Sequence, residues 1–89
     1  MQNIKNLERA LKALANKRRL AIIEYIKRRQ SVSVGDIAAE IDLSIKATSK
    51  HLGVLSAANI VEKTQHSSRV FYRLAEHQES TAEHVIALM

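Results

Sequence analysis

Two predicted helices that are joined by very few residues constrain this fold more than any other feature of the sequence. Apolar residues at helical spacing predict a short helix that ends near Ile41 and a second helix over residues 45–58, with Ser44 as its N-cap. Because only Asp42 and Leu43 connect them, the two helices must cross steeply, as in a helix-turn-helix. The residues of the second helix that we expect to face the core are Thr48, Leu52 and Leu55.

After this pair the hydrophobic period changes from helical to two. Residues 60–64 and 69–74 are therefore predicted to form the two strands of a hairpin, with residues 65–68 at its tip. We expect Phe71 and Tyr72 to anchor this hairpin in the core, because an aromatic pair on an alternating strand usually packs.

The rest of the chain is mostly helical in pattern. Terminal helices are predicted over 3–15 and 81–89, the latter capped by Ser80. Asn16 is a predicted N-cap of another helix, and 31–34 a short strand. The inward stripe of that helix would be Leu20, Ile23 and Ile26. The predicted fold is a winged helix-turn-helix, mainly α with a small β-hairpin. Its order is helix, helix, strand, helix, helix, strand, strand, helix, in one domain over residues 1–89.

The chain has 89 residues and no cysteine, so its core is small and neither a disulfide nor a thiolate metal site can reinforce it. We therefore predict a homodimer in which a second copy supplies buried surface. The predicted dimerisation residues lie in the two terminal helices and are Ile4, Leu7, Leu11, Leu14, Val85, Ile86 and Met89. Neither a membrane-spanning run nor a signal-peptide core is visible, so we expect a cytoplasmic protein without membrane contact.

Charge is distributed unevenly along the chain. Fourteen Lys and Arg against nine Asp and Glu give a net charge of +5. Residues 1–29 carry nine of the basic residues, whereas residues 74–89 carry three acids and no Lys or Arg. A basic balance favours a polyanionic partner. The sequence has no glycine-rich phosphate loop and no nucleophile motif, so we predict neither an enzyme nor a cofactor.

The second helix of the predicted pair has a polar stripe opposite its core face. Lys46, Ser49, Lys50 and Gly53 follow one another at spacings of three and four residues. Lysine can contact guanine or phosphate, and serine either, while a glycine allows close approach of a phosphate strand. Residues of the hairpin can contact phosphates or the minor groove. The predicted contacts with double-stranded DNA are Ser44, Lys46, Ser49, Lys50, His51, Lys63, His66 and Arg69.

Two alternatives stay open for these residues. They can be ordinary solvated side chains, or the domain can be a protein-interaction or architectural module, because a fold alone does not determine function. A protein-binding version of the helix would carry apolar or aromatic residues on its exposed stripe, where this chain has Lys46, Ser49 and Lys50.

The segments 11–23, 34–38, 44–55 and 70–74 resemble the ArsR/SmtB family of bacterial and archaeal repressors. The resemblance implies a dimer built from the first and last helices, an operator with two-fold symmetry and release by an effector. Arg19 matches the family's arginine at the start of the second helix. The positions that match its recognition-helix pattern are Ser44, Ser49, His51 and Leu52.

The chain departs from the family's metal sites. Where many members carry Cys-x-Cys it has Ser33 and Gly35, and where others carry Asp-x-His it has Ala82 and His84, with the chain ending before a second pair. We therefore predict no metal site. A metal-responsive repressor that uses clustered histidine and glutamate is the alternative, against a solvated helix end in which Glu83 completes the cap. The clustered residues are Glu76, His77, Glu79, Glu83 and His84.

Overall fold

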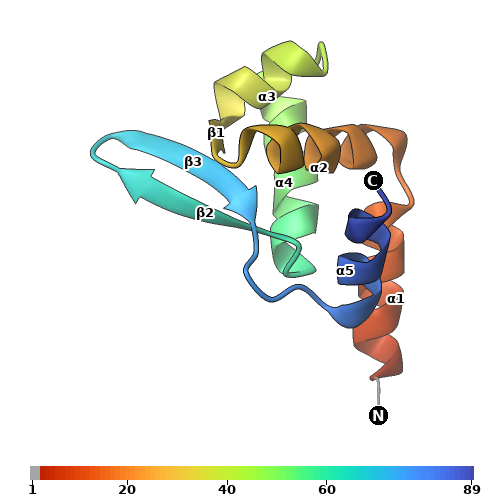
Figure 1. Cartoon of the computed structure of the whole chain (residues 1–89). Coiled ribbons are helices and arrows are strands. Elements are labelled where there is room, and N and C mark those ends of the chain that lie inside the picture. Colours follow the sequence, from red (N-terminus) through yellow and green to blue (C-terminus); the bar gives the residue numbers. More distant parts are fainter. Residues whose placement is uncertain (1–2) are drawn as a thin grey trace.

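The computed structural model describes residues 3–89, which form five helices and one three-stranded antiparallel sheet (Figure 1). The helix-turn-helix pair is α3 and α4, and β2 and β3 form the hairpin, which projects away from the helices as a wing (Figure 1). The predicted order of elements is confirmed. The elements are α1 (Ile4–Leu14), α2 (Lys17–Arg29), β1 (Val32–Ser33), α3 (Val34–Glu40), α4 (Ile45–Ala57), β2 (Val61–His66), β3 (Arg69–Leu74) and α5 (Ser80–Ala87).

Side-chain oxygens cap α2, α3 and α4, at Asn16 and Ser44 as the sequence predicted. Asn16 Oδ1 accepts hydrogen bonds from the backbone N–H groups of Arg18 and Arg19 at the start of α2. Ser33 Oγ accepts from the third residue of α3 at 3.2 Å, and Ser44 Oγ accepts from the third residue of α4 at 3.1 Å. Each cap satisfies a backbone donor that has no partner within its own helix.

The last helix starts one residue earlier than expected. Its N-cap is Glu79, whose carboxylate accepts hydrogen bonds from the N–H groups of Thr81 at 2.9 Å and Ala82 at 3.1 Å. The prediction of Ser80 as the cap was therefore wrong. A carboxylate satisfies the same donors and adds a favourable interaction with the positive end of the helix dipole. The helix also ends earlier than predicted, at Ala87.

One hydrophobic core lies where the helices meet the base of the sheet. Thr48, Leu52 and Leu55 of α4 are completely buried, as predicted. The expected stripe of α2 also faces inward, since Ile23 and Ile26 are completely buried and the half-buried Leu20 packs against the core. Neighbouring elements contact α2 on more than this stripe, so α2 buries further residues. Its buried residues are Ile22, Ile23, Tyr25 and Ile26.

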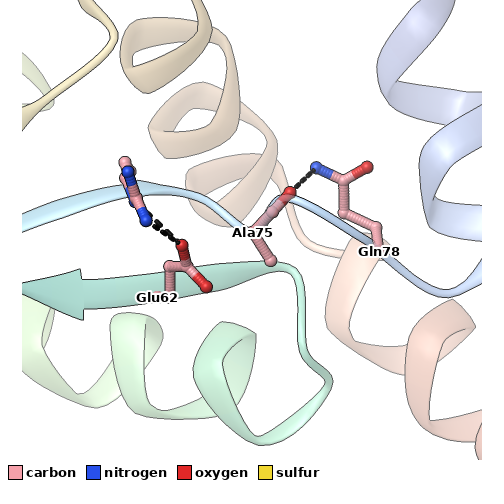
Figure 2. Close-up of polar contacts among 4 residues, drawn as sticks. Glu62, Ala75 and Gln78 are labelled. Atoms are coloured by element: carbon pink, nitrogen blue, oxygen red, sulfur yellow. Dashed lines mark hydrogen bonds and ion pairs between the residues drawn. The ribbon is translucent and has the colours of Figure 1, made fainter.

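The wing is held in register at its base. The strands pair from Val61 opposite Leu74 to His66 opposite Arg69, so the turn has two residues instead of the predicted four, with φ of 58° at Ser67. The wing base also carries an ion pair between Arg73 and Glu62, 2.7 Å apart, shown with the neighbouring bond from Gln78 Nε2 to the Ala75 carbonyl in Figure 2.

The connections into and out of α4 use left-handed backbone. Asp42 has a φ of 54° and Asn59 a φ of 58°, a conformation that asparagine and aspartate tolerate better than most residues. The side-chain amide of Asn59 also donates to the His77 carbonyl at 3.0 Å, which connects the end of α4 to the segment before α5.

Candidate nucleic-acid interface

The outward face of α4 is basic and exposed. Lys46, Ser49 and Lys50 are exposed, and their side chains make no hydrogen bond or ion pair within residues 3–89. They lie opposite the buried face of the helix, and α4 contains no acidic residue. A Cβ added at Gly53 would meet no atom within 4 Å, so the space beside this glycine is open. The face can therefore approach a polyanion without desolvating an acid.

Arg19 joins α1, α2 and α4 through its guanidinium group. Its Nε donates to the Ala13 carbonyl at 2.6 Å and one terminal nitrogen donates to the Lys12 carbonyl at 2.9 Å, which satisfies the end of α1. The other terminal nitrogen lies 3.3 Å from His51 Nδ1 on α4. This contact connects α4 to the rest of the domain. No local sequence pattern predicts it, and only the family resemblance pointed to Arg19.

His51 lies on the side of α4 that faces this joint. It is half-buried, in contrast to the exposed Lys46 and Lys50. Burial, followed by the positive charges of Arg19 and Arg18, lowers the pKa of its imidazole below the ordinary value. His51 therefore packs beside Arg19 and lies away from the centre of the exposed face formed by Lys46, Ser49 and Lys50.

Two of the predicted wing residues are brought together around an aromatic ring. The His66 ring meets the Phe71 ring edge-on with centroids 5.9 Å apart, and the Arg69 guanidinium lies 5.4 Å from the Phe71 centroid. The prediction that Phe71 anchors the wing in the core was therefore wrong. Phe71 instead supports two exposed side chains near the tip of the wing. Tyr72 does pack against the core.

The third wing residue, Lys63, lies on the opposite face of the hairpin. Successive side chains on a strand alternate between faces, and Lys63 pairs with Tyr72 whereas His66 pairs with Arg69. Lys63 and His66 are three residues apart, and this odd spacing already predicts that they lie on opposite faces of the strand. Lys63 is exposed but does not belong to the group formed by the other two.

The acidic C-terminal residues do not form a metal-binding group. Among residues 3–89, no three His, Cys, Asp or Glu side chains lie close enough together to hold a metal ion. The carboxylate of Glu79 caps α5 instead. Within the same residues, no helix is both long and apolar enough to span a membrane.

The predicted dimerisation residues divide into exposed and buried ones. Leu14 and Ile86 are 6% exposed and belong to the core of the single chain. Leu7 and Val85 are half-buried. The residues of α1 and the C-terminal end that stay exposed are Ile4 (82%), Leu11 (48%), Leu88 (75%) and Met89 (37%), and we call these four the apolar patch.

Lys27 supports this end of the molecule. Its Nζ donates to the Ile86 carbonyl at 2.8 Å and lies 3.4 Å from the Met89 carbonyl, so α2 holds the last turn of α5 in place. A cation at the C-terminal end of a helix also complements its dipole. Leu88, which was not among the predicted dimerisation residues, lies exposed at this end of the molecule.

A steep helix pair with an exposed basic second helix, followed by a hairpin wing, defines a winged helix-turn-helix protein. The protein family described as a helix-turn-helix domain matches residues 14–64 of this chain. The winged helix-turn-helix DNA-binding domain of a possible ArsR-family transcriptional regulator from Mycobacterium bovis, a homodimer, superposes with a TM-score of 0.82 at 28% identity, over 96% of this chain and 75% of that one.

Two further relatives point the same way. The biofilm growth-associated repressor of Agrobacterium fabrum is 38% identical over 66 residues, which are 74% of this chain and 56% of the relative. The structure of HlyU from Vibrio cholerae, a transcriptional activator, superposes with a TM-score of 0.81 at 31% identity, over 98% of this chain and 90% of that one. This chain belongs to the ArsR/SmtB family of winged helix-turn-helix proteins, a class of transcription regulators and not of enzymes. It spans about half the length of the curated relatives it matches.

Proposed function

We propose that this chain binds duplex DNA sequence-specifically as a homodimer and represses transcription. The observation that carries the proposal is the exposed, acid-free stripe of Lys46, Ser49 and Lys50 on α4, opposite a fully buried face. In a helix-turn-helix, side chains of the second helix reach base edges in the major groove. Lysine donates to guanine O6 and N7, and a serine hydroxyl can bond to several base edges. Action on chromosomal DNA fits the cytoplasmic location that we expect.

The apolar patch supports the dimer. Ile4 and Leu88 are exposed over most of their surface in the single chain, and covering them with a second copy removes that surface from water. A symmetric dimer binds two half-sites related by a two-fold axis, with centres about 34–36 Å apart. We therefore propose a two-fold-symmetric operator. A dimer seated on a promoter blocks access to it, which is the simplest route to repression.

Selection from a random duplex pool tests this function. The expected result is a consensus with two-fold symmetry. Lys46→Ala and Lys50→Ala should each weaken binding to that consensus by about 1–3 kcal/mol if the lysine contacts a base. Arg69→Ala in the wing should weaken binding to all sequences alike. Unchanged affinity for the consensus in both α4 variants would overturn the assignment of this helix.

A protein-interaction module is the second candidate, because Ile45 (58% exposed) and Val54 (42% exposed) flank the stripe on α4. Salt dependence separates the two functions. A DNA-binding chain loses affinity for random duplex steeply as salt rises, whereas binding through apolar contacts does not. An architectural DNA-binding protein would show the salt dependence but select no consensus.

A further inference from the structure

A groove of about 430 Å³ lies between α1 and α4, and four of its eight lining residues are Lys or Arg. In Figure 1, α1 and α4 stand upright and run in opposite directions, with α2 crossing near their upper parts. The α1 wall carries Lys5, Arg9 and Lys12, and Glu8 is the acidic residue among those that line the groove. These three cations are not among the DNA contacts proposed above for α4 and the wing.

The cations lie on a different flank of α1 from the apolar patch. At 100° per residue, Lys5, Arg9 and Lys12 centre about 120° around the helix from the flank of Ile4 and Leu11. The buried residues Ala10 and Ala13 lie between these flanks on the inner side of the helix. A second copy that covers the apolar flank therefore leaves the basic flank accessible.

The groove continues the DNA-facing stripe of α4. Its α4 wall is formed by Val54 and Ala57, which follow Lys50 at spacings of four and three residues and so lie in one row along the helix. Gly53 and Ala57 are small, and no acid interrupts this row. A polyanion lying on Lys50 can thus extend along the row until it meets the cations of α1.

We propose that this groove binds a phosphate strand of the duplex next to the segment read by α4, through Lys5, Arg9 and Lys12. The inference rests on the DNA binding proposed above. The three cations extend over about 10 Å of helix axis, which corresponds to the axial rise of about three phosphates of one strand. These contacts carry no sequence information and would position α4 in the major groove of the DNA.

Binding measured against salt concentration tests the proposal. Arg9→Gln and Lys12→Gln preserve helix propensity and replace exposed side chains, so folding should not change. In a symmetric dimer each substitution removes two phosphate contacts, so the slope of log K against log salt should become shallower by about two units. Affinity at 0.2 M salt should fall about tenfold for any sequence.

Two matched variants serve as controls. One should tighten DNA binding, and the other should leave it unchanged. Glu8 lies 4.0 Å from Lys12, and Glu8→Gln removes a negative charge from the groove, so it should tighten binding. Arg29→Gln removes the same charge as Arg9→Gln, but Arg29 lies ten residues along α2 from the groove residue Arg19, about 15 Å away. For Arg29→Gln, the slope of log K against log salt should equal that of the wild type.

The outcomes separate the groove from the function. A wild type that binds no duplex refutes the proposed function and the groove with it. A wild type that binds and loses affinity on Lys50→Gln, while Arg9→Gln behaves like Arg29→Gln, refutes the groove alone. The groove proposal would also be overturned if the groove cations bound polyglutamate while their substitution left DNA binding unchanged. That result would indicate an acidic protein partner.

Discussion

Replacing Leu11 by alanine should weaken the dimer without unfolding the chain. Leu11 lies on the same exposed flank of α1 as Ile4 and is 48% exposed. Burying a fully exposed leucine is worth about 1.5–3 kcal/mol, so burying the exposed half yields about 0.7–1.4 kcal/mol per copy. A two-fold interface contains two copies, and the loss is about 1.5–3 kcal/mol. The dissociation constant of the dimer should therefore rise about 10- to 150-fold.

Sedimentation equilibrium over a range of protein concentrations measures this change. Ile45→Ala is the matched control, because Ile45 is 58% exposed but lies on α4, outside the apolar patch. It should leave self-association unchanged. Leu14→Ala is the contrasting variant, because Leu14 is 6% exposed and its truncation should lower the free energy of unfolding by about 2–5 kcal/mol.

Two results would refute the reasoning about the patch. In one, the wild-type chain sediments as a monomer at tens of micromolar, a concentration at which ordinary dimers form. In the other, Leu11→Ala associates as tightly as the wild type while Ile45→Ala does not. The second result would move the interface from α1 to the exposed face of α4.

Local hydrogen-bonding chemistry made much of the fold predictable. Asn16 and Ser44 cap helices and Asn59 adopts left-handed backbone, and each does so through its own side chain or backbone preference. The start of α5 was harder, because Glu79 and Ser80 are adjacent and both can supply an oxygen to the first turn. Spacing alone does not choose between them.

The helical spacing of the apolar residues in α1 did not predict which of them are buried within the single chain. Ile4, Leu11 and Leu14 recur at helical spacing, and the sequence treats them as equivalent. In the structure, the small residues Ala10 and Ala13 allow α1 to lie close to the core, so the buried flank centres on them. Leu14 reaches that flank, whereas Ile4 and Leu11 do not.

The candidate site was predictable in its composition but not in its arrangement. The exposed stripe of Lys46 and Lys50 follows from helical periodicity once the core face is known. The grouping of His66 with Arg69 and Phe71 depends on strand register, which short strands specify only through their turn and their buried face. The contact from Arg19 to His51 joins residues far apart in the sequence, and no local signal encodes it.

Three further predictions concern stability. The hydroxyl of Thr48 is buried and has no hydrogen-bond partner among residues 3–89, so Thr48→Val should raise the free energy of unfolding in urea by about 1 kcal/mol, and a decrease would contradict this. Gln30 has a φ of 75°, which glycine adopts without strain, so Gln30→Gly should raise the urea midpoint, whereas a lowered midpoint would show that the turn is unstrained. The pKa of His51 is lowered in the folded chain by burial and then by Arg19 and Arg18. Its unfolded-state pKa is about 6.5, so on acidification the unfolded chain takes up this proton before the folded chain does. The contribution of neutral His51 to stability is therefore complete above about pH 6.5 and is lost as pH falls from there through the folded-state pKa. Urea unfolding at a series of pH values should show this loss in the wild type and a smaller one in His51→Gln, and an equal loss in both would show that another group is responsible.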